Sequence, residues 1–315
     1  MNIAFVMDPI EHIKPYKDTT FFLMLAAVDR GHCVFSVHHG SLEMRGGRVF
    51  GFLEEIKVRD QTDSYYRVVS SEWKALAEMD VVFIRTDPPF DRRYSYACIM
   101  LERVSRETLV VNNPESLLVW NEKLAAQRYS EYSPATLVTS QLDSLLTFLG
   151  QVGGRMIVKP VDGHGGRGIF VVREGDPNMD QLLKVSTHGG SHWVVAQAYV
   201  PEASVGDKRI LLLDGEPIGS ILRVHAEGKE LNNLDAGGTA FSSELSERDL
   251  AICAAMRADL KDADLFFVGI DVIGGQLIEI NVTSPTGLRE AARFLGRPLN
   301  HEIIEALEMK RAAFS

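Results

Sequence analysis

Residues 265–290 read LFFVGIDVIGGQLIEINVTSPTGLRE, two apolar runs that flank Gly274-Gly275. Apolar, β-branched runs on either side of a glycine pair predict a β-hairpin. Three polar side chains interrupt this otherwise apolar ribbon: Asp271, Glu279 and Asn281. The hairpin therefore carries two carboxylates and an amide on strands that are otherwise suited to burial.

The register of the hairpin decides whether these polar side chains share one face. Residues two apart on a strand point the same way, so Glu279 and Asn281 do. Asp271 joins them only if the connection has an odd number of residues or a bulge, because a strict two-residue loop pairs it with Ile278. Converging oxygens of this kind suit Mg²⁺ held partly by substrate phosphates. The alternative is three strand-end polar groups that face water.

Composition and charge narrow the class of protein. A length of 315 residues suits two domains, or one domain with a large subdomain, around an ample core. The formal net charge of −10 argues against a dedicated nucleic-acid binder, so anionic substrates need placed arginines and lysines. Cys33, Cys98 and Cys253 stand far apart and outside any C-x-x-C, which favours buried free thiols. No apolar run approaches ~18 residues, and Asp8 comes too early for a secretory signal, so we expect a cytoplasmic protein without a membrane partner.

The first part of the chain alternates strands with helices. Strands are predicted at 2–7, 33–38, 81–85 and 109–111, helices at 18–31 and 94–106, and a surface hairpin at 45–58. This order predicts a doubly wound, largely parallel sheet. Ligands gather at the carboxyl ends of such strands, where residues 8–10 and 85–89 lie. A further helix, predicted from 114 to about 131, contains Asn121-Glu122-Lys123.

Near residue 121 the character of the sequence changes without a visible linker. Strands joined by glycines are predicted at 156–160, 168–172 and 193–197, a hairpin at 208–224, a polar mobile loop at 225–243, and helices at 179–186, 246–260, 287–295 and 299–310. We therefore place a domain boundary near residue 121.

A glycine-rich loop follows the predicted strand at 156–160. Residues 163–168, GHGGRG, match G-x-G-x-x-G, but the dinucleotide-binding form of this motif needs a helix next, and a strand follows here. Glycines between two strands are instead typical of a flap whose backbone N–H groups close over nucleotide phosphates. A plain hairpin turn is the alternative, and it explains one glycine better than four.

Four cations add to this pattern. Lys159 lies in an apolar strand, where a lysine is costly unless it is paired or meets a ligand. Lys123 alone fits a solvated helix face, and Arg209 and Arg223 alone fit strand rims. With the flap and the carboxylates they form the set that phosphoryl transfer to a carboxylate requires, because cations neutralise the charge that develops during transfer.

These segments resemble ATP-grasp ligases and, more closely, prokaryotic glutathione synthetases. The resemblance rests on Lys123 in NEK, on MIVKPVDGHGGRGIF, on QAYVPEASVGDKRILLLDGEPIG, and on VGIDVIG with EINVTSPTGLRE. VMDPIEHIKPYKDTT and IRTDPPFD are similar to that family's substrate domain, so the match covers nearly the whole chain. The resemblance implies an α/β chain with a doubly wound, mostly parallel sheet domain at 1–121. An ATP-grasp domain of two α+β subdomains follows at 122–315, with a nucleotide flap at about 122–200 and a catalytic part at about 201–315.

The resemblance also implies a reaction, in which γ-glutamylcysteine is joined to glycine at the expense of ATP. ATP phosphorylates the cysteinyl carboxylate, the glycine amine attacks the acyl phosphate, and glutathione, ADP and phosphate are formed. The implied cofactor is Mg²⁺, or Mn²⁺ in its place, and the implied assembly is a homotetramer.

Matching positions carry over the family's roles. Mg²⁺ between the nucleotide phosphates is assigned to Asp271, Glu279 and Asn281. ATP binding is assigned to Lys123, Lys159, Gly165, Gly166, Gln197, Tyr199, Val200 and Asp207, with the adenine hinge at 197–200 and Asp207 near the ribose. Stabilisation of the acyl phosphate and the intermediate is assigned to Arg209 and Arg223. The peptide and glycine side is assigned to Arg85, Asp87, Ser284, Pro285 and Thr286, with Asn233, Gly237 and Gly238 in the mobile loop.

The mobile loop departs from the family pattern. That pattern is E-x-R-G-N followed by a glycine pair and an arginine, whereas here KELNNLDAGGTAF has Leu231 and Thr239 in place of the arginines. Losing two cations from a lid over anions loosens closure, or reflects a different donor or acceptor. Two other functions therefore stay open, a related ATP-grasp ligase with another substrate and a non-catalytic ATP-binding regulatory protein. The latter is disfavoured because binding alone needs neither the full carboxylate set nor Arg209 and Arg223.

Overall fold

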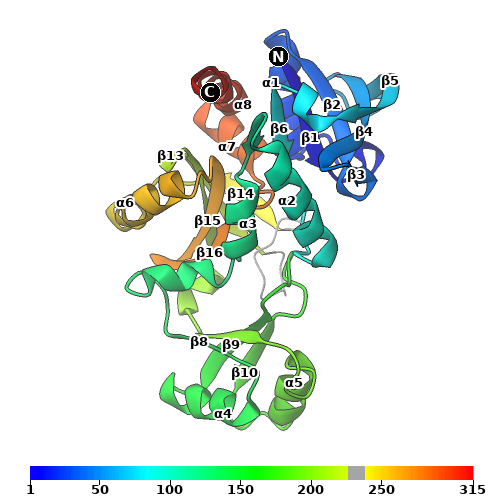
Figure 1. Cartoon of the computed structure of the whole chain (residues 1–315). Helices are drawn as coiled ribbons and strands as arrows, with labels where there is room; N and C mark the ends of the chain where they lie inside the picture. The colour runs from blue at the N-terminus through cyan, green and yellow to red at the C-terminus, as the bar shows by residue number, and fades with distance from the viewer. Residues whose placement is uncertain (226–237, 315) are drawn as a thin grey trace.

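The computed structural model describes residues 1–225 and 238–314. Within these residues the strands form three sheets. Figure 1 shows the first sheet at the N-terminal end of the molecule, the second at the opposite end and the third between them. No helix in the described ranges is long and apolar enough to cross a membrane.

The first sheet is a parallel core extended by an antiparallel ribbon. Its order is β3-β4-β2-β1-β6-β7, with β5 paired to β4, and β2, β1, β6 and β7 run parallel. Its strands are β1 (Asn2–Met7), β2 (Cys33–His38), β3 (Leu42–Arg45), β4 (Arg48–Val58), β5 (Tyr66–Ala75), β6 (Val81–Ile84) and β7 (Leu109–Val111). Its helices are α1 (Thr19–Asp29), α2 (Arg92–Val104) and α3 (Pro114–Val119).

Helices cover both faces of this sheet, as the sequence predicts. In β1, Ile3 and Phe5 pack in the same apolar cluster as Phe21 of α1, whereas Ala4 packs with Leu101 of α2. The alternation follows from the pleat of the strand, which turns successive side chains to opposite faces. Aspartates start two of the helices, because Asp18 accepts from Phe21 N at 2.7 Å and Asp91 caps α2.

The second and third sheets are antiparallel. The second has the order β10-β9-β11-β8 and the third the order β14-β13-β12-β15-β16. The second contains β8 (Thr136–Thr139), β9 (Arg155–Pro160), β10 (Phe170–Arg173) and β11 (Val194–Ala198), with α4 (Leu142–Gln151) and α5 (Met179–Ser186). The third contains β12 (Asp207–Leu213), β13 (Glu216–Val224), β14 (Thr239–Ser242), β15 (Phe267–Ile273) and β16 (Gln276–Asn281), with α6 (Glu247–Asp262), α7 (Leu288–Leu295) and α8 (Leu299–Ala313).

Two predicted segments differ from the structure. The helix predicted to continue to about 131 ends at Val119 in α3, because the Asn121 side chain accepts from Lys123 N and Leu124 N, both at 3.1 Å. Such a local side-chain turn competes with helical hydrogen bonding. The loop predicted at 225–243 contains an edge strand, β14, which pairs with β13, and residues 226–237 lie outside the described part of the chain.

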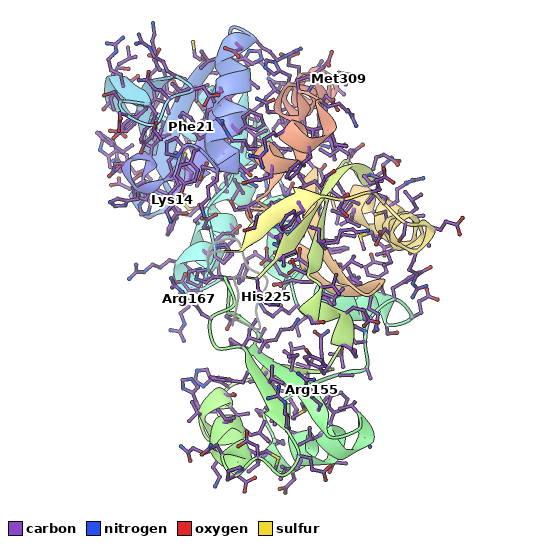
Figure 2. The ribbon with its side chains drawn as sticks, turned by 180° about the vertical axis from the view of Figure 1, so that it is seen from behind. Lys14, Phe21, Arg155, Arg167, His225 and Met309 are labelled. Atoms are coloured by element: carbon purple, nitrogen blue, oxygen red, sulfur yellow. The ribbon has the colours of Figure 1, made fainter. Side chains whose placement is uncertain are left out.

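The C-terminal helices return to the first sheet. α8 packs against α1, and Figure 2 shows Met309 of α8 at the same end of the molecule as Phe21 of α1. Asn300 Nδ2 donates to Phe22 O at 3.0 Å, and Arg30 pairs with Glu308 at 2.6 Å. One buried apolar cluster thus joins both ends of the chain through Ile3, Phe5, Phe21, Leu299, Ile303 and Leu307.

Asn112 fastens the end of the first sheet to the third. Its buried side chain donates from Nδ2 to Phe267 O at 2.9 Å and to Val282 O at 2.8 Å. Its Oδ1 accepts from Phe267 N at 2.9 Å. These three bonds hold β7 against β15 and the residue that follows β16, next to the hairpin with Asp271.

Replacing Asn112 with alanine is expected to lower the free energy of unfolding by about 3 kcal/mol, because several buried backbone groups lose their partners. The matched control is Asn113→Ala, which removes only the cap of α3 and is expected to cost about 1 kcal/mol. Urea denaturation of both variants measures the difference. Equal losses would show that Asn112 does not bridge the sheets.

Candidate active site

The hairpin of β15 and β16 resolves the register left open by the sequence. Gly274 and Gly275, at φ 56° and 73°, form a two-residue turn that needs positive φ. The register then shifts by one residue beside Asp271, so that Asp271 lies opposite Glu279 and Ile278 is bulged out. The bulge puts Asp271 on the face that Glu279 shares with Asn281.

Asp271 is the centre of a buried ion cluster. Its Oδ1 lies 2.6 Å from Arg209 Nε, and its Oδ2 lies 3.0 Å from Arg209 Nη2 and 2.9 Å from Arg223 Nη2. The strand register places Arg209 directly opposite Asp271. Burial alone would raise the pKa of Asp271, but the two guanidinium groups outweigh it and hold the pKa well below its usual range. Asp271 is therefore ionised at neutral pH.

Asp207 holds Arg223 from the other side. Arg223 lies opposite Asp207 in the sheet and binds it through two hydrogen bonds, 2.7 Å from Nε and 2.8 Å from Nη2. Burial raises the pKa of Asp207 to about 6, although Arg223 acts against this. Burial by itself would lower the pKa of Arg223, but Asp271 and Asp207 together raise it. Arg223 is thus a fixed positive charge between two carboxylates.

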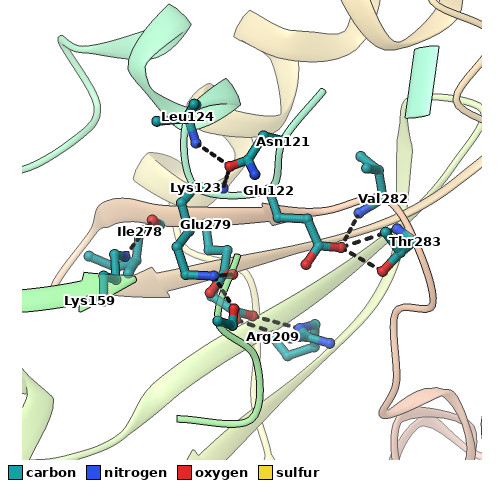
Figure 3. A network of polar contacts seen from close by, with 12 residues as sticks. Asn121, Glu122, Lys123, Leu124, Lys159, Arg209, Ile278, Glu279, Val282 and Thr283 are labelled. Atoms are coloured by element: carbon teal, nitrogen blue, oxygen red, sulfur yellow. Dashed lines mark hydrogen bonds and ion pairs between the residues drawn. The ribbon is translucent and has the colours of Figure 1, made fainter. Parts of the chain in front are cut away.

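Two lysines approach the same hairpin from other elements, as Figure 3 shows. Lys123 Nζ lies 3.1 Å from Glu279 Oε1 and also donates to the carbonyl of Gly163 in the glycine-rich loop. Lys159 Nζ, on β9, donates to the carbonyl of the bulged Ile278 at 3.4 Å. Lysine ammonium groups therefore lie beside the carboxylate hairpin and under the glycine-rich loop.

Glu122 is a site residue that the sequence reasoning did not single out. Its half-buried carboxylate accepts from Val282 N at 3.0 Å, Thr283 N at 3.1 Å and Thr283 Oγ1 at 2.8 Å (Figure 3). Burial, together with the nearby Glu279, raises its pKa. The signal available in the sequence was its place beside Lys123. Glu122 fixes the end of β16, where Asn281 lies.

The glycine-rich loop and the segment after β11 form the opposite wall. Gly165 and Gly166 adopt φ of 63° and 77°, which glycine tolerates without strain. Gln197 is buried and its Nε2 donates to Thr136 Oγ1 at 3.1 Å. The guanidinium of Arg155 lies over the ring of Tyr199, with Cζ 3.4 Å from the ring centroid. Figure 2 shows Arg155 on the second sheet.

The far end of the site comes from the first sheet. Buried Arg85 follows β6 and donates to Thr20 Oγ1 at 3.1 Å and to Pro285 O at 2.9 Å. Burial lowers its pKa to about 10. Burial raises the pKa of Asp87 to about 6, although a hydrogen bond with Ser284 and the charge of Arg85 oppose this. The carboxyl end of the parallel sheet thus meets the segment that follows the hairpin.

A cavity of about 460 Å³ joins these walls. Among the residues singled out from the sequence, its lining includes Asp87, Lys123, Lys159, Gly165, Gly166, Gln197, Tyr199, Val200, Asp207, Arg209, Arg223, Asp271, Glu279, Asn281, Ser284 and Thr286. Arg85, Pro285 and Gly238 are not among the residues that line it. Asn233, Gly237 and Leu231 fall outside the described residues. Asp8, in the strand-end segment 8–10 where ligands were expected, also lines the cavity, as does Glu122, to which the sequence analysis assigned no role.

The donor set of the hairpin fits a hard divalent cation. Asp271 and Glu279 offer carboxylate oxygens and Asn281 an amide oxygen, ligand types that suit Mg²⁺. Asn281 Nδ2 is buried without a hydrogen-bond partner in the described part of the chain. The surrounding lysines and arginines can hold phosphate groups beside such a cation. The arrangement is therefore suited to polyphosphate binding and to phosphoryl transfer.

Two family models match the chain. Residues 122–296 match the model described as "Prokaryotic glutathione synthetase, ATP-grasp domain", and residues 1–117 match that enzyme's N-terminal domain. The glutathione synthetase of Vibrio cholerae is 40% identical over 315 residues, 99% of each chain. That of Shewanella oneidensis is 38% identical over 312 residues, 98% of this chain and 99% of its own.

Solved structures share the fold at low sequence identity. D-cycloserine synthetase superposes with a TM-score of 0.65 at 16% identity, covering 96% of this chain and 100% of its own. The D-alanine–D-alanine ligase of Bacillus anthracis complexed with ATP gives a TM-score of 0.62 at 17% identity, covering 100% of both chains. At these identities the similarity concerns the fold alone.

Proposed function

The chain belongs to the prokaryotic glutathione synthetase family, so it is an ATP-dependent ligase that forms glutathione, and we propose that the cavity described above is where it joins γ-glutamylcysteine to glycine. The family resemblance and the α/β ATP-grasp fold predicted from the sequence are thereby confirmed. The observation that carries the site assignment is the meeting of Arg209, Arg223 and the hairpin carboxylates under a glycine-rich loop.

The reaction has two steps. A carboxylate oxygen of γ-glutamylcysteine attacks the γ-phosphorus of ATP, the bond to the bridging oxygen breaks, and ADP leaves with the electron pair. The glycine nitrogen then attacks the acyl carbon and loses a proton, and phosphate leaves from the tetrahedral intermediate. Negative charge develops on the transferring phosphoryl group and on the tetrahedral oxygen, so fixed cations nearby lower both barriers.

Arg209 and Arg223 are the proposed catalytic cations. Asp271 and Asp207 hold their guanidinium groups in place before substrate arrives, which reduces the reorganisation needed in the transition state. Arg209 Nη1 also donates to Thr286 O at 3.2 Å, beside the proposed peptide and glycine side. Both guanidinium groups line the cavity and are more than nine-tenths buried, so water screens them little.

ATP is proposed to lie between the glycine-rich loop and the third sheet. Lys123 and Lys159 would contact its phosphates, with backbone N–H groups of Gly165 and Gly166 above them. Gln197, Tyr199 and Val200 would border the adenine, and Asp207 the ribose, while still holding Arg223. Support comes from their common lining of one cavity.

Asp271, Glu279 and Asn281 are proposed to hold Mg²⁺, or Mn²⁺, between the nucleotide phosphates. When bound, the cation would neutralise phosphate charge and orient the γ-phosphate for in-line transfer. Glu122 positions this set from behind, since its carboxylate fixes the backbone of Val282 and Thr283 just after Asn281.

The peptide and glycine side is proposed to consist of Asp87, Ser284 and Thr286, which line the cavity. Arg85 would act through the carbonyl of Pro285, which it contacts at 2.9 Å. Asn233, Gly237 and Gly238, in the loop predicted at 225–243, are proposed to help cover the substrates.

Phosphate release tests the proposed reaction. ATP and Mg²⁺ are supplied with γ-glutamylcysteine and glycine, together and singly, and the product is identified by mass spectrometry. Release that needs both substrates and yields glutathione is the expected result. Release with γ-glutamylcysteine and another amine, but none with glycine, would instead assign a different acceptor to this cavity.

ATP affinity is expected to fall as the pH rises above about 8, because Lys159 then loses its proton. Burial lowers the pKa of Lys159 to about 8, against the opposing charge of Glu279. Below this pH the free enzyme carries the charged lysine; above it, binding must take up a proton, which costs up to about tenfold in affinity per pH unit. Titration with a non-hydrolysable ATP analogue between pH 7 and 9.5 measures this. The Lys159→Arg variant should give a flat profile, and a flat wild-type profile would contradict the assignment.

The finer organisation is also proposed. A boundary near residue 121 would separate the substrate domain, 1–121, from an ATP-grasp domain, 122–315, and the enzyme would act in the cytoplasm as a homotetramer. The exposed apolar side chains Phe52 and Trp73, on β4 and β5, support an assembly surface on the ribbon of the first sheet. Light scattering of the purified chain measures the assembly.

A further inference from the structure

Three side chains of types that can ligate metal ions meet at the carboxyl ends of β1 and β2, away from the hairpin that carries Asp271. Asp8 directly follows β1, His38 ends β2, and His39 comes next. The two strands are parallel, and their register places Met7 opposite His38, so the sheet itself brings the three together. One ligand atom from each lies within 4.8 Å of the other two.

Each of the three side chains keeps an atom for a further partner. Asp8 uses Oδ2 to accept from Asp87 N at 2.8 Å, which orients the carboxylate and leaves Oδ1. His38 uses Nδ1 to accept from Gly40 N at 3.3 Å, which leaves Nε2. His39 Nδ1 is buried and, within the described ranges, has no hydrogen-bond partner. A buried polar atom without a partner requires an explanation, and a bound cation would supply one.

We propose that Asp8, His38 and His39 bind a divalent transition-metal ion of the Zn²⁺ class. Two imidazole nitrogens and a carboxylate are ligands that Zn²⁺, Co²⁺ and Ni²⁺ favour, whereas Mg²⁺ favours oxygen alone. Ligand atoms around a four-coordinate Zn²⁺ lie about 3.3 Å apart, so the cluster must contract slightly. His38 is exposed, and a small tilt of its ring that keeps Nδ1 near Gly40 N would bring Nε2 closer to the other two ligands. Three protein ligands leave a fourth position for water or another donor.

Gly40 makes room for the outer ligand. A Cβ at this position would lie 2.9 Å from Nδ1 and Cε1 of His38, so an added methyl group must displace the ring. The rings of His38 and His39 have their centroids 4.4 Å apart, which leaves little freedom for a displaced ring to stay in place. Gly40→Ala thus disturbs the geometry while keeping all three ligands.

The proposed ion lies next to the cavity but belongs to a separate site. Asp8 lines the cavity, whereas His38 and His39 do not. The carboxylate of Asp8 would bind the ion through one oxygen and accept from the backbone N–H of Asp87 through the other. The ion would therefore stiffen the strand ends beside the proposed peptide and glycine side. The proposal concerns metal binding by the ligand-free chain and stands apart from the proposed reaction.

Cobalt absorption tests the site directly. The untagged full chain is titrated with Co²⁺ in saturating Mg²⁺, which occupies oxygen-rich sites. Four-coordinate Co²⁺ absorbs far more strongly in the visible range than six-coordinate Co²⁺, so the two kinds of site differ in their spectra. We expect one equivalent of four-coordinate Co²⁺, displaced by Zn²⁺. His39→Ala should abolish the signal, and Gly40→Ala should weaken Co²⁺ binding about tenfold.

Two variants are matched controls. His188 and His192 form another histidine pair, with ring centroids 4.1 Å apart, and Cys33 is an exposed thiol on β2. His192→Ala and Cys33→Ser should both keep the signal. Circular dichroism checks that every variant is folded. Absence of the visible bands in the wild-type chain, their persistence in His39→Ala, or their loss in either control would overturn the proposal.

Discussion

The Glu279→Gln variant is expected to form glutathione about a thousandfold more slowly than the wild-type enzyme while keeping its fold. Glutamine preserves the shape of the side chain but removes the negative charge proposed to hold Mg²⁺. The stability cost is expected to be smaller than for a change at Asp271, because the Glu279 side chain is partly exposed and Lys123 keeps its bond to the carbonyl of Gly163. Initial rates with saturating ATP, γ-glutamylcysteine and glycine give the comparison.

The dependence of the rate on Mg²⁺ concentration distinguishes the loss of a metal ligand from a general disturbance of the structure. Loss of a metal ligand should raise the Mg²⁺ concentration needed for half-maximal rate, which a merely structural defect would not do. Glu54→Gln, on β4 and outside the cavity lining, is the matched control and should behave like the wild-type enzyme. A normal rate for Glu279→Gln would remove this carboxylate from the proposed metal site.

The Asp271→Asn variant is expected to lose both activity and stability. Asp271 neutralises Arg209 and Arg223 inside the protein, and removing one partner of a buried ion pair typically costs about 3–5 kcal/mol. Chemical denaturation should therefore show a much lower free energy of unfolding than for Glu279→Gln. An unchanged stability would show that water reaches these arginines more freely than their burial indicates.

A double variant distinguishes the loss of activity from the loss of stability. Replacing Asp271 with leucine and Arg209 with methionine removes a whole ion pair, and well-packed apolar substitutes often restore much of the stability. Arg223 would keep its two hydrogen bonds to Asp207. We expect the double variant to be more stable than Asp271→Asn and equally inactive. Recovery of activity along with stability would mean that the charges at 271 and 209 matter only for folding.

Local patterns predicted most of the fold. Apolar runs with glycine turns predicted the hairpin of β15 and β16, and the β-α-β order predicted the parallel core of the first sheet. The register of that hairpin stayed open because a bulge depends on contacts across the sheet. Here the bulged carbonyl of Ile278 accepts from Lys159, a residue 119 positions away in the chain, and periodicity in the sequence does not reveal such a partner.

The prediction was wrong where side chains override propensity. Residues 114–131 have the apolar spacing of a helix, yet Asn121 ends it by capping the backbone of Lys123 and Leu124. Glu122 escaped notice for the same reason, since a glutamate on a predicted helix suggests a solvated face. The role of its carboxylate is visible only in the structure, where the chain turns and brings it to Thr283.

The packing of α8 on α1 has a consequence for the order of synthesis. Leu299, Ile303 and Leu307 complete the apolar cluster that begins with Ile3 and Phe5. A ribosome must therefore synthesise the chain as far as α8 before the face of α1 that packs against it is covered. Until then that apolar face stays exposed and can bind chaperones. A chain cut short before α8 keeps it exposed.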